Sequence, residues 1–163
     1  MQVKTLYFSP IGTLALISDS GALTSVIFQK EAAFAAAVGE IADGQNKALC
    51  DAVLWLNSYF KGDVPKGVPE IRLSGTKYQL AVWEELLQIP YGKTASYKEI
   101  AIRAAENTGS PGFSAQAAGG AVGHNPVPII VPCHRVIGSD GSLTGYRWGA
   151  DIKKALLSLE NAL

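Results

Sequence analysis

Cysteine and histidine are scarce in this sequence. Its 163 residues include two cysteines, Cys50 and Cys133, and two histidines. The spacings CxxC and HxxxH do not occur, so we expect no zinc site and no other metal or cofactor. Cys50 lies beside the apolar stripe of an expected helix, which favours a half-buried core residue. The cysteine that needs an explanation is therefore Cys133.

Long apolar runs are also missing. No stretch approaches the roughly 20 apolar residues that are needed to span a bilayer. Residues 1–21 contain apolar clusters interrupted by Pro10, Gly12 and Asp19, unlike the continuous apolar segment of a secretion signal. We therefore expect a cytoplasmic protein with no membrane partner. Because the cytosol is reducing, both cysteines are expected to be free thiols.

The sequence lacks an excess of either charge. It has 14 basic and 14 acidic residues and a formal net charge of zero, in a globular composition that is 48% apolar and 17% charged. A protein that binds many phosphates usually has a basic excess. If nucleic acid is the partner, bulk electrostatic attraction is not what holds it.

The pattern of elements predicts an α+β fold in two domains. Residues 1–30 alternate β-rich runs with turn residues, as in a small antiparallel sheet, and two helix-prone segments follow. Residues 61–75 are rich in proline and glycine and are the best candidate for a linker. We therefore place an N-terminal sheet-and-helix domain at 1–72 and a mostly helical C-terminal domain at 73–163.

Two short helices of the second domain suggest a helix-turn-helix. The first starts at Ser96, where Glu99 completes a capping box, and a loop over 107–113 separates it from the second. The second segment, SAQAAGGAVGHN at 114–125, is nearly all Ala and Gly, although each glycine in a helix costs about 1 kcal/mol relative to alanine. Side chains this small allow another backbone to come close. Taken alone, the segment also fits a plain glycine-rich loop.

Cys133 follows a short apolar run in the stretch VPCHRVIG. The residues from Ile129 to Val131 favour a buried extended segment, and regular pairing should end at Pro132, which cannot donate a ladder hydrogen bond. In an extended strand, the side chains of Cys133 and His134 would point to opposite faces. If the backbone turns here, the imidazole could take the thiol proton, directly or through water, and leave a nucleophilic thiolate. The residues alone leave packing and catalysis both open.

Several motifs around Cys133 resemble those of one protein family. Ser-Tyr at the start of the first helix, Asn-Pro-Val-Pro, Pro-Cys-His-Arg, Tyr-Arg-Trp-Gly and a final helix all occur in family order. Residues 76–160, at least, resemble the O6-alkylguanine-DNA alkyltransferases, also called methylated-DNA–protein-cysteine methyltransferases. Residues 1–72 resemble the variable sheet-and-helix domain of that family only in outline. The resemblance implies that the second domain carries a winged helix-turn-helix.

The resemblance implies a DNA repair reaction at Cys133. Its thiolate would attack the alkyl carbon on O6 of guanine, or on O4 of thymine. The product is a thioether on the protein and a restored base, so each molecule reacts once. His134 would relay the thiol proton through water toward Glu160. Tyr97 would contact the flipped nucleotide and protonate the departing purine, because a guanine anion leaves poorly.

The same resemblance implies a pocket for the flipped base. The carbonyl of Val136 and that of the cysteine itself would accept from the exocyclic amine of the base. Tyr146 would form a wall, and the backbone amide of Arg147 would donate toward O6. Lys153 matches a lysine near the pocket. Asn125 would join the second helix to the active-site loop through side-chain-to-backbone hydrogen bonds.

The resemblance also implies a role for the glycine-rich segment. In the family this helix enters the minor groove of double-stranded DNA, which is only about 6 Å wide. We therefore expect the following residues to bind DNA: Gln116, Ala117, Gly119, Gly120 and Gly123. The family usually has an arginine at the position of Gln116, inserted where the flipped base leaves the stack. Glutamine is shorter and uncharged, so we expect weaker DNA binding or less efficient flipping of the target nucleotide. We also expect the protein to act as a monomer.

Two other functions stay open. A cysteine hydrolase would use Cys133, His134 and Glu160 with repeated turnover, but it would leave the glycine-rich helix without a role. A winged-helix protein that binds lesions without transfer would have an inert cysteine. Repeated turnover of an ester would indicate the first function, and an unchanged function after Cys133→Ala would indicate the second.

Overall fold

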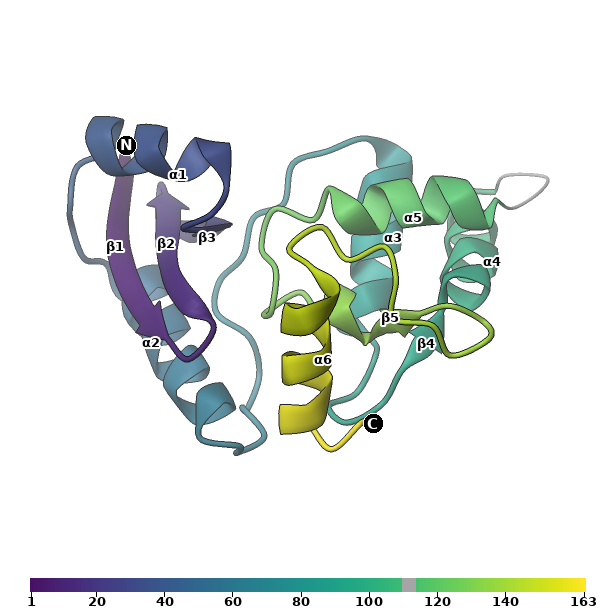
Figure 1. The fold of residues 1–163 in the computed structure, drawn as a ribbon. Coiled ribbons are helices and arrows are strands. Elements are labelled where there is room, and N and C mark those ends of the chain that lie inside the picture. Colours follow the sequence, from purple (N-terminus) through teal and green to yellow (C-terminus); the bar gives the residue numbers. More distant parts are fainter. Residues whose placement is uncertain (110–113) are drawn as a thin grey trace. The chain divides into compact units, whose positions relative to one another are not determined.

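The structure is a computed structural model that describes residues 1–109 and 114–163. The chain divides into two compact units, Met1–Leu73 and Ser74–Leu163, which are treated separately below (Figure 1). The boundary expected from the proline- and glycine-rich segment lies one residue earlier. The loop expected over 107–113 lies partly outside the described residues.

The first unit contains a three-stranded antiparallel sheet. Its strands follow the order β1 (Gln2–Ser9), β2 (Gly12–Asp19), β3 (Ala22–Phe28). Two-residue connections join them. Both residues of the second connection have positive φ, 50° at Ser20 and 86° at Gly21. This is the geometry of a type I′ turn, whose twist matches that of the flanking strands.

Two helices pack on this sheet, α1 (Ala32–Glu40) and α2 (Lys47–Phe60). Asn46 caps α2, because its side chain accepts a hydrogen bond from the backbone N–H of Leu49 at 3.0 Å. One stripe of α2 is buried, from Leu49 to Tyr59. Cys50 lies beside that stripe and is exposed, so the prediction of a half-buried core residue was wrong. Each residue turns the helix by roughly 100°, which carries the neighbour of a core position out to the solvent.

The second unit contains three helices that pack against one another. They are α3 (Lys77–Leu87), α4 (Tyr97–Thr108) and α5 (Ala115–Gly123). Capping boxes start α3 and α4, and the second is the one that Ser96 and Glu99 form. The indole Nε1 of Trp83 donates to the carbonyl of Ala121 at 2.8 Å and ties α3 to α5. Helices α4 and α5 are the expected helix-turn-helix pair.

A short parallel strand pair joins the start of α4 to the cysteine segment. Strand β4 (Ala95–Ser96) pairs with β5 (Val136–Ile137), and the 3₁₀ turn η1 (Cys133–Arg135) comes directly before β5. Because β4 leads into α4, this pairing brings the first residue of α4 toward η1. Helix α6 (Ala150–Leu159) completes the unit.

The α+β fold expected from the sequence is confirmed, with a small antiparallel sheet and helices followed by a mostly helical unit. Within residues 1–109 and 114–163, no helix has the length and apolar content that crossing a bilayer requires. The same residues hold no cluster of three or more His, Cys, Asp or Glu side chains that could bind a metal ion.

Candidate active site

Cys133 is the first residue of η1, in the interior of the second unit. Its side chain is only 1% exposed. Pro132, with φ −83° and ψ 63°, ends the extended run, and the amide of Cys133 donates to the carbonyl of Val131 at 2.8 Å. The backbone therefore turns at the cysteine, which removes the strand geometry that would have sent Cys133 and His134 to opposite faces.

His134 and Arg135 both bind the carboxylate of Glu160. His134 Nε2 lies 2.5 Å from Glu160 Oε2, and Arg135 Nε donates to Oε1 at 2.8 Å. The amide of Gly92 donates to the same Oε1 at 3.0 Å, and Arg135 Nη1 donates to the carbonyl of Ile89 at 2.7 Å. Glu160 is the C-cap residue of α6 and is buried. The structure thus brings His134 and Glu160 together, as the sequence analysis expected.

Arg135 is the member of this cluster that the sequence analysis missed. Its guanidinium is buried, and besides its bonds to Glu160 and Ile89 it lies 5.7 Å from the ring centroid of Tyr91. A signal was available, because an arginine within an apolar segment needs a carboxylate when it is buried. Nothing in the sequence indicated which carboxylate it would be.

Burial keeps the thiol and the imidazole of this site neutral. Burial raises the pKa of the Cys133 thiol to about 11, although Asn125, Lys153 and Tyr146 favour the thiolate. Burial also lowers the pKa of His134, although the Glu160 carboxylate favours the imidazolium. At neutral pH the site therefore holds a protonated thiol and a neutral imidazole, which is the form that can accept a proton.

Tyr97 opens α4 and faces the C-terminal loop of the unit. Its hydroxyl lies 3.5 Å from the carbonyl of Thr144, to which it donates. Gly145 has φ +84°, and a Cβ there would lie 3.3 Å from the Tyr97 hydroxyl, so glycine suits both the backbone and the close approach. Burial raises the pKa of the Tyr97 phenol, and negative charge on Cys133 raises it further.

Asn125 links the end of α5 to the segment that leads to the cysteine. It is fully buried, its Nδ2 donates to the carbonyl of Val131 at 2.8 Å, and its Oδ1 accepts from the amide of Val127 at 3.0 Å. Ile129 lies between these two residues with φ +74°, a strained value for a β-branched residue. Two side-chain hydrogen bonds from one asparagine therefore hold a turn that would otherwise be unfavourable.

The other expected pocket residues differ in their surroundings. Val136 and Lys153 are fully buried, and Tyr146 is buried with its ring centroid 5.1 Å from that of Trp148. Lys153 Nζ lies 5.5 Å from the centroid of Tyr97 and 6.0 Å from that of Tyr146, so these three side chains do come together. The Arg147 side chain is exposed and lies over the Trp148 ring at 5.3 Å.

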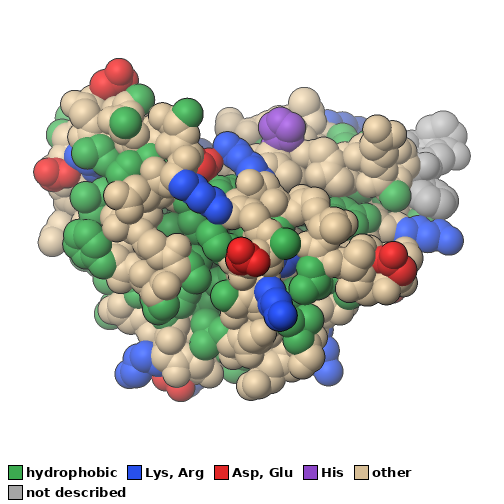
Figure 2. Space-filling model, viewed as in Figure 1, with side chains coloured by type: hydrophobic (Ala, Val, Ile, Leu, Met, Phe, Trp, Pro, Cys, Tyr) green, Lys and Arg blue, Asp and Glu red, His purple; other side chains and the backbone are tan. Residues whose placement is uncertain are grey.

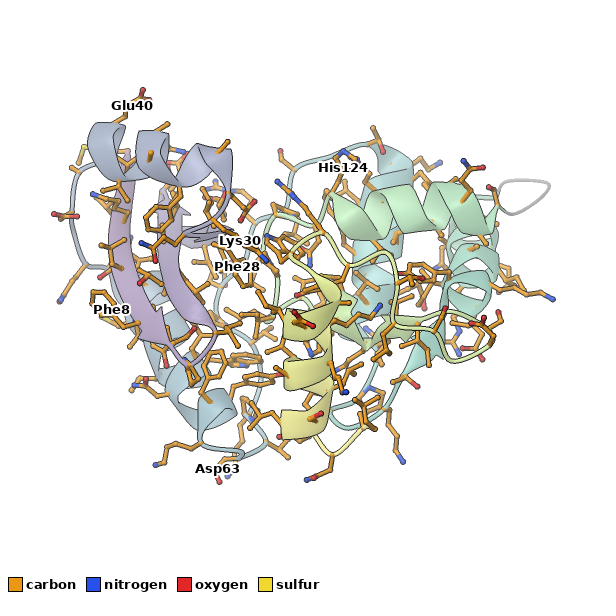
Figure 3. All side chains as sticks on the ribbon, viewed as in Figure 1. Phe8, Phe28, Lys30, Glu40, Asp63 and His124 are labelled. Atoms are coloured by element: carbon orange, nitrogen blue, oxygen red, sulfur yellow. The ribbon has the colours of Figure 1, made fainter. Side chains whose placement is uncertain are left out.

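Helix α5 presents small, uncharged residues to the solvent. Gln116, Ala117 and Gly120 are exposed, Gly119 and Gly123 are partly buried, and the inward face consists of Ala118, Ala121 and Val122. Figure 2 shows Lys and Arg side chains, in blue, at several places on the face in view, with much uncharged surface around them. Figure 3 labels His124 at the C-terminal end of this helix.

Comparison with protein families identifies the class of this protein. Residues 77–162 match the family model for the DNA-binding domain of 6-O-methylguanine DNA methyltransferase, and residues 2–67 match the model for its ribonuclease-like domain. The chain therefore belongs to the 6-O-methylguanine DNA methyltransferase family, which makes it a DNA repair methyltransferase with a DNA-binding domain.

Individual relatives agree along nearly the whole chain. The methylated-DNA–protein-cysteine methyltransferase of Mycobacterium tuberculosis H37Rv is 45% identical over 154 residues, which cover 94% of this chain and 89% of the relative. The protein of that name from Methanosarcina acetivorans is 40% identical over 160 residues, covering 96% and 97%.

Two solved structures from Mycobacterium tuberculosis have a similar fold. The crystal structure of O6-methylguanine methyltransferase has a TM-score of 0.83 and 42% identity, with 99% of this chain and 94% of the other covered. The structure of its OGT in complex with DNA has a TM-score of 0.81 and 43% identity, covering 96% and 91%.

Proposed function

We propose that this chain transfers an alkyl group from O6 of guanine in double-stranded DNA to the sulfur of Cys133, once per molecule. The observation that carries the proposal is the buried Cys133 at the start of η1, next to a histidine bound to a buried carboxylate. In the reaction the S–C bond forms as the C–O bond breaks, and the electron pair of that bond goes to the purine. A thioether does not hydrolyse under ordinary conditions, so the protein is consumed.

The thiol must lose its proton before it can attack. We assign this step to His134, which accepts the proton through a water molecule while Glu160 stabilises the imidazolium. The 2.5 Å separation of His134 Nε2 and Glu160 Oε2 supports this assignment, because a carboxylate that close orients the ring and favours its charged form. Arg135 holds the carboxylate in place from its other oxygen.

The target nucleotide leaves the base stack and enters the protein in this proposal. Its base is held by the carbonyls of Cys133 and Val136, with Tyr146 as a wall and the amide of Arg147 directed to O6. Tyr97 gives a proton to the departing purine. The proximity of Lys153 to the rings of Tyr97 and Tyr146, and of Tyr146 and Lys153 to Cys133, supports a pocket of this kind.

Helix α5 is proposed to enter the minor groove, and the glycines of this helix support the proposal. A Cβ on Gly120 or Gly123 would meet nothing within 4 Å, so internal packing does not require glycine at either position. Each glycine nevertheless costs about 1 kcal/mol in a helix relative to alanine. Glycine is explained if DNA comes close to the helix at these positions, because a narrow minor groove leaves little room for side chains.

Two finer points belong to the same proposal. The pocket accepts O4-alkylthymine as well, because O4 of thymine and O6 of guanine carry the alkyl group on equivalent exocyclic oxygens. One chain is sufficient for the reaction, and the protein acts as a monomer, since every proposed site residue belongs to the second unit of a single chain.

Intact-protein mass spectrometry after incubation with a duplex that carries one O6-methylguanine tests the proposal. We expect a gain of one methylene on the peptide that contains Cys133, saturating at one per protein. Cys133→Ser should show no gain, and Cys50→Ser should react normally because Cys50 lies in the other unit and is exposed. A bound duplex without mass gain would indicate a lesion-binding protein, and repeated turnover of an ester would indicate a hydrolase.

A further inference from the structure

Lys153 is a buried titratable residue to which the proposed reaction assigns no task. Its side chain is 0% exposed on α6, and among the described residues Nζ has no hydrogen-bond partner. The other buried lysine differs, because Lys4 donates to the carbonyl of Ile41 at 2.7 Å and to Asp43 at 2.6 Å. A buried ammonium without hydrogen bonds is costly, so its presence in this position calls for a functional reason.

The surroundings of Lys153 point to the reacting groups. The ring of Tyr97 lies 5.5 Å from Nζ, and that of Tyr146 lies 6.0 Å away. Burial lowers the pKa of Lys153 to about 8, and negative charge on Cys133 acts in the opposite direction. The charge of Lys153 in turn favours the Cys133 thiolate and disfavours protonation of His134.

The other charges near the cysteine balance one another. Glu160 forms an ion pair with Arg135, whose Nε lies 2.8 Å from Oε1, and it also binds His134. Among the described residues, no carboxylate oxygen lies within 4.0 Å of Lys153 Nζ. A negative charge that develops on Cys133 during the reaction would stabilise the charged form of Lys153.

We propose that Lys153 is a positioning residue for the transfer, whose ammonium offsets the negative charge that begins on the Cys133 sulfur and ends on the Tyr97 oxygen. The proposal rests on the proposed alkyl transfer. Cys133 gives its proton to His134, and the thiolate forms the S–C bond as the C–O bond breaks. The purine that leaves with the electron pair takes the phenolic proton of Tyr97. Lys153 then returns a proton to the phenolate, and Lys153 and His134 recover their starting states by exchange with water.

Two electrophiles distinguish the effect of Lys153 on the Cys133 thiolate from its effect on proton transfer by Tyr97. Methyl transfer from duplex O6-methylguanine needs both the thiolate and a proton on the leaving purine. Alkylation of Cys133 by iodoacetamide needs the thiolate alone, because iodide leaves without a proton. A Cys50→Ser background leaves Cys133 as the single thiol, so both single-turnover rates can be followed by intact mass.

Three variants are compared in that background. Lys153→Met removes the charge at similar length, Lys153→Arg keeps the charge, and Lys154→Met removes a charge from the exposed neighbour on the same helix. We expect Lys153→Met to slow iodoacetamide alkylation about tenfold and methyl transfer about 100-fold, from the loss of one nearby charge and of support for proton transfer. Lys153→Arg should recover most of both rates, and Lys154→Met should leave both unchanged.

A double-mutant cycle with Tyr97→Phe tests whether Lys153 offsets the negative charge on the Tyr97 oxygen. Without the phenol no charge reaches the Tyr97 position, so Lys153→Met should then slow methyl transfer only by the factor seen with iodoacetamide. The proposal is overturned by normal iodoacetamide alkylation of Lys153→Met, or by an additional loss in methyl transfer that persists after Tyr97→Phe. A loss that Lys153→Arg does not relieve, with a matching fall in thermal stability, would mean a structural role and also overturn it. If the unmodified protein takes no methyl group from DNA, the proposed function fails, while the iodoacetamide comparison still tests the charge on Cys133.

Discussion

His134 Nε2 and Glu160 Oε2 lie 2.5 Å apart with both side chains fully buried, although 26 positions separate them in the chain. The second oxygen of the same carboxylate binds Arg135 at 2.8 Å. The carboxylate of Glu160 therefore binds both residues that directly follow the cysteine. Its contact with His134 belongs to the proposed proton transfer, and its contact with Arg135 helps to hold the turn.

Glu160→Gln should cost both stability and activity. The amide cannot balance the buried guanidinium of Arg135, and an uncompensated buried charge of this kind costs about 3–5 kcal/mol. Urea unfolding measures this loss, and Asp151→Asn, an exposed acidic residue of the same helix, is the matched control with an expected change within about 0.5 kcal/mol. The rate of methyl transfer should fall in Glu160→Gln and stay normal in Asp151→Asn. A stability loss as small as that of the control would contradict the ion-pair assignment.

The free energy of unfolding should fall in alkaline solution because of Cys133. Burial raises the pKa of this thiol from 9.0 to about 11, so the folded state keeps a proton that the unfolded state releases. This contribution is fully present below pH 9 and is lost as the pH rises toward 11, by about 2–3 kcal/mol for a shift of this size. Urea unfolding of the wild type and of Cys133→Ala over this range isolates the effect, because other titrating groups, Lys153 among them, are shared by both proteins. A difference that stays constant with pH would show that the thiol is not desolvated.

Gln116→Arg should strengthen binding to duplex DNA. An arginine on the exposed face of α5 adds a charged donor that can bind phosphate or fill the gap left by a flipped base, and a charged hydrogen bond contributes roughly 1.5 kcal/mol or more, about tenfold in affinity. Gln88→Arg makes the same change at an exposed position at the end of α3 and is the matched control. Fluorescence anisotropy at one fixed salt concentration compares the two. Equal affinities for both variants would remove Gln116 from the DNA interface.

Gly120→Ala should stabilise the protein and weaken its binding to DNA. A Cβ at this position meets nothing within 4 Å, so the helix gains the propensity difference of about 1 kcal/mol. The same methyl group would occupy space that the proposed groove contact needs. Gly39→Ala in α1 is the control, because a Cβ there also meets nothing within 4 Å. Thermal unfolding should shift upward in both variants, and DNA affinity should fall only in Gly120→Ala; unchanged affinity would argue against close approach at α5.

Local features of the sequence predicted the helix starts well. Ser96 and Glu99 lie three positions apart and form the expected capping box, because both hydrogen bonds are made within one turn of backbone. The glycine-rich segment 114–125 was ambiguous between a helix and a loop. It forms α5, since Ser114 caps it and Trp83 of α3 binds the carbonyl of Ala121.

Features that depend on distant contacts were predicted less completely. Cys50 was expected to be half-buried and is exposed, because a stripe of apolar residues does not by itself show which flank faces the sheet. Arg135 was not singled out, because its partners at positions 89 and 160 are known only once the chain is folded.

By itself the sequence determined the α+β class, the helix caps, the order of motifs around Cys133 and the small side chains of α5, since each depends on residues close together in the chain. Tertiary structure alone decided that the backbone turns at the cysteine, that Glu160 is shared by His134 and Arg135, and that Lys153 is buried near two tyrosine rings. Packing decides these features because it sets the distances between charges, and those distances and their burial determine which protons can move.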